Sequence, residues 1–306
     1  MPLAPFPFTL RQLQYVVAVA DQRSFRGAAE TCRVAQPSLS AQVAEVESQI
    51  GVQLFERGHG PVRPTEAGVA FVEHARAVLL GATALRDTTQ TLRDPFQRTL
   101  RVGVIPTVAP YLLPEVGPAL RKKYPQLSLH WVEEKTAVLL QSLHHGDLDA
   151  VIVAAGPETA ALPKVVLGKD PFVFAAAPNH PLARRKKPIE AADLDGERVL
   201  LLDDGHCFRD QALSFCARHG AEEAGYRATS LQTLVQMAAS GDAVTLLPNL
   251  ALAVENRRET LVVRAFGPRG PSRTLALVWR KSSGATVTLE AVGEALQRAV
   301  RKFLHR

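Results

Sequence analysis

Two cysteines nine residues apart, Cys207 and Cys216, are the residues of this chain best suited to chemistry. A thiolate is a nucleophile, and oxidation can join two thiols into a disulfide. Phe208, Ala212 and Phe215 recur at helical spacing around them, which predicts a short amphipathic helix. Nine residues of helix span about 13 Å, whereas a disulfide needs Cα atoms closer than about 7 Å. The sulfurs therefore cannot bond unless the helix breaks, which makes the segment a candidate switch.

The two thiols have different predicted surroundings. Residues 200–205 indicate a strand that ends in a turn, so Cys207 lies at a helix start, where backbone amides and the helix dipole favour an anion. Apolar neighbours predict that Cys216 is buried and inert. The plain alternative is that a free cysteine is a small buried hydrophobe, and this is the interpretation we give to Cys32. A metal site at His206 and Cys207 lacks a second pair of ligands in the sequence, so no metal is expected.

Composition narrows the class of protein. The chain has 306 residues, enough for two or three domains with real cores. No apolar run reaches about 18 residues, so no membrane-spanning helix is expected. Residues 1–7 lack the basic end and apolar core of a secretory signal. Three cysteines do not make an extracellular disulfide framework, so we expect a cytoplasmic protein in which a disulfide is redox-sensing.

The net charge of +6 is weak evidence for nucleic-acid binding. Residues 1–65 hold six Lys or Arg against five Asp or Glu, and residues 66–95 hold three against four. The excess lies in residues 96–306, with 27 against 21.

The first 65 residues nevertheless have the pattern of a winged helix-turn-helix. Helices are predicted to start after Thr9 and Ser24, and a third runs from Gln36 to its end at Gly51. The third helix has a small polar outer face that suits a DNA major groove, and a β-wing follows it. The candidate DNA-binding residues are Gln36, Pro37, Ser38, Ser40, Gln42, Arg57 and Arg63. The alternative is an ordinary three-helix bundle with solvated polar faces.

A long helix over residues 66–95 comes next, with Thr65 as its predicted cap, and its apolar stripe predicts dimerisation. From residue 96 strands alternate with helices, which indicates an α/β domain. The predicted strands are residues 100–105, 127–133, 149–154, 172–178, 200–203, 243–247 and 275–279. We predict two subdomains with a ligand cleft between them, subdomain I at about 96–170 and 274–306 and subdomain II at about 171–273. The predicted fold class is therefore an α+β winged helix-turn-helix (residues 1–65), a linker and dimerisation helix (66–95), and an α/β effector domain (96–306).

Residues 13–17, 24–29, 36–40, 51–57 and 65–68 together resemble LysR-type transcriptional regulators. The resemblance implies that the α/β domain is a periplasmic-binding-protein-like effector domain. Residues 105–114, 203–212, 215–216, 227–230 and 272–274 resemble the peroxide-sensing OxyR group of that family. This implies that Cys207 is the peroxidatic cysteine and Cys216 the resolving one, joined after oxidation by a disulfide. The implied peroxide-pocket residues are Thr107, Thr136, His206, Asp210 and Arg273.

The sequence thus predicts a hydrogen peroxide-sensing, DNA-binding regulator, expected to activate antioxidant genes, rather than an enzyme. The expected partners are double-stranded promoter DNA, hydrogen peroxide, RNA polymerase and further copies of the chain in a homodimer or homotetramer, and no cofactor or membrane is expected. Two alternatives stay open. One is a LysR-type regulator that reads a small organic effector in the cleft, and the other is a thiol peroxidase, which has no use for a DNA-binding domain.

Overall fold

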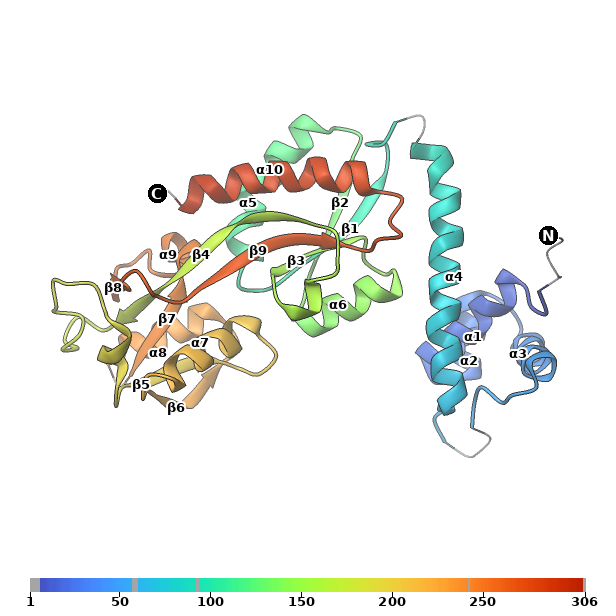
Figure 1. Ribbon diagram of the computed structural model, residues 1–306, viewed down its shortest axis with the longest axis horizontal. Helices are drawn as coiled ribbons and strands as arrows, with labels where there is room; N and C mark the ends of the chain where they lie inside the picture. The colour runs from blue at the N-terminus through green and yellow to red at the C-terminus, as the bar shows by residue number, and fades with distance from the viewer. Residues whose placement is uncertain (1–5, 57–59, 92–93, 242, 305–306) are drawn as a thin grey trace. The chain divides into compact units, whose positions relative to one another are not determined.

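The computed structural model describes residues 6–56, 60–91, 94–241 and 243–304. The chain divides into two compact units, residues 1–89 and residues 90–306. The domain and subdomain boundaries given above stay predictions. The elements of each unit are labelled in Figure 1.

The first unit is built on three short helices, α1 (Leu10–Gln22), α2 (Phe25–Cys32) and α3 (Gln36–Ile50). The predicted start and end signals are confirmed. Thr9 caps α1 in a capping box, and the hydroxyl of Ser24 accepts from the amide of Gly27 at 3.2 Å. Each such cap stabilises a helix by about 1 kcal/mol. Gly51 ends α3 with a φ of 73°, in the left-handed region that favours glycine.

Helix α4 (Glu66–Thr91) follows an antiparallel bridge between Phe55 and Pro64. Thr65 begins it as predicted, because its hydroxyl accepts from the amide of Gly68 at 3.0 Å. Residues 66–86 are by length and composition sufficient to cross a membrane, contrary to the expectation from sequence. However, α4 buries Val72 in the core of the first unit, and Arg76 forms an ion pair with Asp21. Both contacts belong to a helix packed on a folded domain.

The second unit is organised around a mixed nine-stranded sheet in the order β2-β1-β3-β9-β4-β7-β5-β6, with β8 also paired to β4. The strands are β1 (Thr99–Val104), β2 (Ser128–Glu133), β3 (Ala150–Ala154), β4 (Lys164–Ala176), β5 (Arg198–Leu202), β6 (Glu222–Ala228), β7 (Val244–Pro248), β8 (Val262–Ala265) and β9 (Ser272–Trp279). The β1–β2, β1–β3, β5–β6 and β5–β7 pairs are parallel, whereas β4 and β9 pair antiparallel with their neighbours. The long strands β4 and β9 run from the β1–β3 group to the β5–β8 group (Figure 1).

Helices flank these strands, and α10 lies along β4 and β9 (Figure 1). The helices are α5 (Ala109–Lys123), α6 (Thr136–His145), α7 (Cys207–Ala217), α8 (Leu231–Ala239), α9 (Leu252–Glu255) and α10 (Thr286–Leu304). Three 3-10 turns, η1 (Pro157–Thr159), η2 (Ala191–Leu194) and η3 (Asn249–Ala251), complete the unit.

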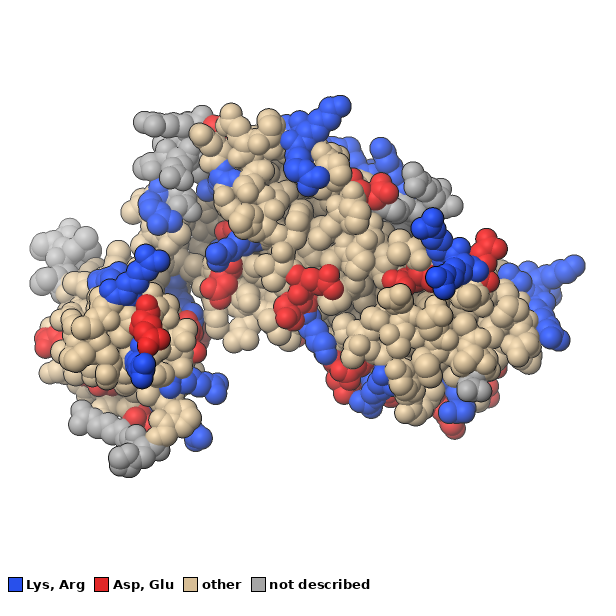
Figure 2. Space-filling model, turned by 180° about the vertical axis from the view of Figure 1, so that it is seen from behind, with Lys and Arg blue, Asp and Glu red and all other residues tan. Residues whose placement is uncertain are grey.

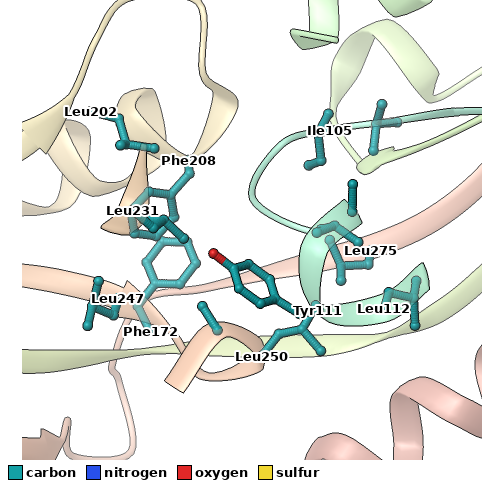
Figure 3. Packing of buried hydrophobic residues seen from close by; sticks show 14 of the residues in the cluster. Ile105, Tyr111, Leu112, Phe172, Leu202, Phe208, Leu231, Leu247, Leu250 and Leu275 are labelled. Carbon is teal, nitrogen blue, oxygen red and sulfur yellow. The ribbon is translucent and has the colours of Figure 1, made fainter. Parts of the chain in front are cut away.

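One apolar core runs through the whole second unit. Trp279, Phe174 and Phe208 are among its largest fully buried side chains. Figure 3 shows Phe208 of α7 beside Phe172 of β4, with Tyr111 of α5 projecting toward them. The rings of Phe172 and Phe208 meet edge to face at 4.8 Å between centroids. The first turn of α7 thus packs against β4, one of the two strands that connect the two halves of the sheet.

The structure extends the elements expected from sequence in three places. β4 begins at Lys164, whereas we predicted a strand only over 172–178. β6 and β8 were not predicted. β6 and β8 carry charged or exposed residues and lie at the margins of the sheet, and the first part of the central strand β4 is largely exposed, so the apolar signal of all three in the sequence is weak.

Candidate functional site

The outer face of α3 is the candidate DNA-binding surface of the first unit. The helix buries Leu39, Val43 and Val46 against α1 and α2. The polar residues predicted to contact DNA therefore lie on its other side: Gln36, Pro37, Ser38 and Gln42 are exposed and Ser40 is half-buried. Short side chains at the start of an exposed helix are the arrangement that lets a helix enter a major groove.

The predicted wing is described on either side of its tip, where Phe55 and Pro64 form an antiparallel bridge. The amide of Glu56 donates to the carbonyl of Arg63 at 2.9 Å, and the carboxylate of Glu47 in α3 accepts from the amide of Leu54 at 2.7 Å. The wing is thus attached to the helix that carries the polar face. Arg63 is exposed on it, whereas Arg57 lies outside the described residues. An exposed arginine here can contact a phosphate at the edge of the groove.

In the second unit, α7 carries both cysteines of the predicted switch, and both are free thiols. Cys207 is its first residue and is half-buried, whereas Cys216 is 2% exposed. Burial raises the pKa of Cys216 to about 12, so this thiol stays protonated near neutral pH. At 100° per residue, nine residues place the two side chains on opposite faces of the helix. A direct bond between them is therefore incompatible with an intact α7.

The turn before α7 is shaped by Gly205, which has a φ of 87°. A side chain there would also approach the Lys135 side chain within 3.0 Å. Lys135 donates to the carbonyl of Asp204 at 2.6 Å and is 3.6 Å from the Asp203 carboxylate. These contacts place the start of α6 against the turn that leads into Cys207. His206, the last residue of the turn, is buried, and burial lowers the pKa of its imidazole.

A buried cluster of charged groups lies next to α7. Arg273 of β9 forms an ion pair with Asp170 of β4 at 2.9 Å, and both side chains are 0% exposed. The Arg273 guanidinium also donates to the hydroxyl and the carbonyl of Thr107, at 2.6 and 2.9 Å. It lies 5.7 Å from the ring centroid of Phe208, the residue after Cys207. Arg273 thus connects β4, β9, the segment after β1 and the first turn of α7.

The five predicted peroxide-pocket residues lie in different surroundings. Thr107 and Arg273 are in direct contact. Thr136 is the first residue of α6, and its hydroxyl is buried without a hydrogen-bond partner in the part of the chain that the structure describes. His206 precedes Cys207 in the buried turn. Asp210 is exposed, one turn beyond Cys207, and lines a groove along α7.

Sequence reasoning missed a second ionic cluster, which holds the first turn of α7. Arg209, only 4% exposed, donates to Asp204 at 2.8 Å and to both oxygens of Glu223 in β6 at 3.0 and 3.1 Å. Arg227 bridges the same two carboxylates from the surface at 3.0 and 2.8 Å. Arg209 and Arg227 lower the pKa of Glu223. The signal was present, since an arginine at the third position of a short helix needs a counter-charge, but its partner could not be identified from sequence.

Basic and acidic side chains are mixed over the visible face of the second unit (Figure 2). The assignment of DNA binding therefore rests on the exposed polar face of α3 and not on the net charge of the chain. In the described residues no group of three or more His, Cys, Asp or Glu side chains could hold a metal ion.

Comparison with known proteins gives a consistent picture. Residues 10–69 match the family model of the bacterial regulatory helix-turn-helix protein, lysR family, and residues 93–301 match the LysR substrate binding domain. The chain is 41% identical over 289 residues to the DNA-binding transcriptional dual regulator OxyR of Escherichia coli K12, covering 94% of both chains. It also resembles the structure of a full-length OxyR variant from Pseudomonas aeruginosa, with a TM-score of 0.78, 35% identity and 96% coverage of both chains. A hydrogen peroxide-bound OxyR mutant from Corynebacterium glutamicum gives a TM-score of 0.66 at 33% identity, covering 98% of this chain and 95% of the other.

Proposed function

Because this chain belongs to the LysR family of bacterial helix-turn-helix regulators, we propose that it is a hydrogen peroxide-sensing transcriptional regulator whose input is Cys207. The observation that carries the proposal is the placement of two free thiols on opposite faces of one short helix, within a chain of this family. Members of the family are DNA-binding regulators and not enzymes, which removes the thiol peroxidase alternative.

The first chemical step is attack of the Cys207 thiolate on one peroxide oxygen. The O–O bond breaks, and Cys207 becomes a sulfenic acid while hydroxide leaves. The amino end of α7 favours the thiolate, and a nearby hydroxyl can supply a proton to the leaving oxygen. We assign the hydroxyls of Thr107 and Thr136 to the peroxide, with His206, Asp210 and Arg273 as further pocket residues. Two observations support this assignment: the buried Thr136 hydroxyl has no hydrogen-bond partner among the described residues, and Arg273 contacts Thr107.

The second step joins Cys207 to Cys216. The Cys216 thiol attacks the sulfenic sulfur, water leaves, and a disulfide forms. Because Cys216 is buried and its pKa is raised to about 12, it does not compete for peroxide in the reduced chain and reacts only once α7 opens. Opening separates Arg209 from Glu223 and moves Phe208 away from Phe172. Oxidation therefore changes the packing where β4 and β9 connect the two halves of the sheet, as a bistable switch requires.

The output is promoter binding by the first unit. The exposed residues of α3 enter the major groove of double-stranded DNA, and Arg63, with Arg57, contacts phosphates beside it. The residues Val69, Val78 and Leu85 of α4 are 59%, 49% and 74% exposed, respectively, an apolar surface that a second copy of the chain can cover. A homodimer, or a homotetramer made of two such pairs, then presents two or more α3 helices to one promoter. We also place the protein in the cytoplasm, with RNA polymerase as its partner in activating antioxidant genes.

The test is transcription from a bound promoter with and without peroxide, using wild type, Cys207→Ser and Cys216→Ser. We expect Cys207→Ser to lose the peroxide response while keeping DNA binding and fold. A normal response in this variant contradicts the thiol switch and favours a LysR-type regulator that reads a small organic effector.

Cys216→Ser separates the sulfenic acid from the disulfide. We expect it to form the sulfenic acid, detected by mass spectrometry, without a full transcriptional response. A full response shows that the disulfide is not needed. Cys32→Ser, which removes the half-buried cysteine of the first unit, is the matched control and should respond as wild type.

A further inference from the structure

A groove runs along the face of α7 that carries Cys207 and continues past the carboxyl end of the helix. It consists of two adjoining cavities of about 540 and 360 Å³, which share Phe215, His219, Arg269 and Gly270. Volumes of this size are typical of small-ligand sites. Of the predicted peroxide-pocket residues only Asp210 borders it, at one edge, and it is therefore a separate feature of the effector unit.

Two arginines with no carboxylate partner among the described residues line the larger cavity. Arg218 follows α7 and Arg269 lies before β9; both are exposed, and neither forms an ion pair with any described residue. Arg209, Arg227 and Arg273 nearby are all paired with carboxylates. Guanidinium groups bind carboxylates through two parallel hydrogen bonds, so two free ones in a single cavity favour an anionic ligand group.

The rest of the groove suits a flat apolar body with polar edges. Phe215 forms its floor, in edge contact with Phe266 at 5.4 Å and beside the His219 ring at 4.9 Å. The amide oxygen of Gln211, which also lines the larger cavity, is buried and has no hydrogen-bond partner among the described residues. Buried polar atoms are normally satisfied, so this amide indicates a polar ligand atom or a bound water.

The two acids at the groove do not neutralise this cationic pair. Asp210 lies eight residues before Arg218, about 12 Å away along the helix axis. Glu190 borders the smaller cavity, beside Gly267. Arg269 lines both cavities, but no ion pair joins it or Arg218 to either acid among the described residues.

We propose that this groove is a ligand site for a small planar organic carboxylate, and that its occupation keeps α7 helical. The second half of the proposal rests on the proposed thiol switch. One wall of the groove is α7 and its following turn, and the other is Phe172 and residues 269–272, so opening of α7 destroys the site. A ligand that binds only the reduced form must therefore oppose disulfide formation by mass action.

The binding test uses the reduced full-length chain at low ionic strength, with sodium benzoate as the probe. We expect saturable binding by calorimetry with a Kd of roughly 1 mM, as for a fragment of this size. Benzamide, which has the ring without the charge, and acetate, which has the charge without the ring, should bind at least about tenfold more weakly. Arg218→Gln with Arg269→Gln should weaken benzoate about tenfold or more, whereas Arg258→Gln, an exposed arginine outside the groove, should not. Equal binding of benzamide, or wild-type binding by the double variant, overturns the site.

The coupling test measures the thiol–disulfide equilibrium of Cys207 and Cys216 in a redox buffer. At about 10 mM benzoate and a Kd of about 1 mM, the ratio of disulfide to dithiol should fall about elevenfold in wild type and stay unchanged in the double variant. An unchanged ratio in wild type refutes the coupling even if benzoate binds. If benzoate binds as expected but Cys207→Ser still responds normally to peroxide, the proposed switch is refuted and the site is left intact.

Discussion

Arg209→Gln tests whether the ionic cluster at the start of α7 sets the balance between dithiol and disulfide. Arg209 lies between the two cysteines, in the segment that must open when they bond. Its hydrogen bonds to Asp204, Glu223 and the Leu202 carbonyl therefore stabilise the reduced form alone. Removing them should favour the disulfide.

The expected change in reduction potential can be estimated from the solvent exposure of the ion-paired side chains. The Arg209 side chain is 5% exposed, Glu223 25% and Asp204 71%. The Asp204 pair is largely screened and contributes about 0–1 kcal/mol. The less exposed pair with Glu223 adds about 1–2 kcal/mol, since hydrogen bonds to charged groups contribute more than neutral ones. A total of about 2 kcal/mol lowers the reduction potential of the disulfide by about 40 mV, because 30 mV corresponds to about 1.4 kcal/mol for a two-electron couple.

The assay is a redox titration of the purified chain, with the free thiols alkylated and counted by mass spectrometry. Arg227→Gln is the matched control, because Arg227 binds the same two carboxylates but its side chain is 48% exposed. We expect this control to shift the potential by less than about 10 mV. The reasoning is refuted if Arg209→Gln leaves the potential within about 10 mV of wild type or raises it.

Two further predictions concern buried ionisable groups of the second unit. Asp170→Asn should lower the free energy of unfolding of reduced protein in urea by about 3–5 kcal/mol, because it leaves the buried Arg273 guanidinium without a counter-charge. Adding Arg273→Met should recover part of the loss, and an equally unstable double variant contradicts this account. His206 has a pKa lowered by burial, so the unfolded chain takes up a proton there more readily than the folded one. Stability should therefore fall as the pH drops below about 6.5, and His206→Gln should flatten that dependence in urea unfolding between about pH 5 and 7. An unchanged slope shows that His206 takes up a proton equally readily in the folded and the unfolded chain, which contradicts the lowered pKa.

Local signals in the sequence correctly located most elements. Thr9, Ser24 and Thr65 were recognised as helix starts, and each hydroxyl accepts a hydrogen bond from the backbone amide three residues later. Capping and apolar periodicity depend on residues within one or two turns, so they can be found without knowing the fold. β6 and the first half of β4 were not predicted from the sequence, because they are strands through their pairing with other strands and not through an apolar pattern of their own.

The sequence by itself identified the two cysteines, their incompatibility with an intact helix and the polar face of α3, because each depends on the spacing of neighbouring residues. Only the tertiary structure decided which charges surround the cysteine helix. Asp170 and Arg273 are 103 residues apart, and Thr107 is 166 residues from Arg273, yet the three form one buried cluster beside Phe208. The pairing of Arg209 with Glu223 likewise depends on how distant segments pack, as does the absence of an ion pair at Arg218 and Arg269 among the described residues. The sequence shows that a residue is charged but not which residue lies beside it. That neighbour is set by the close packing of the sheet and helices.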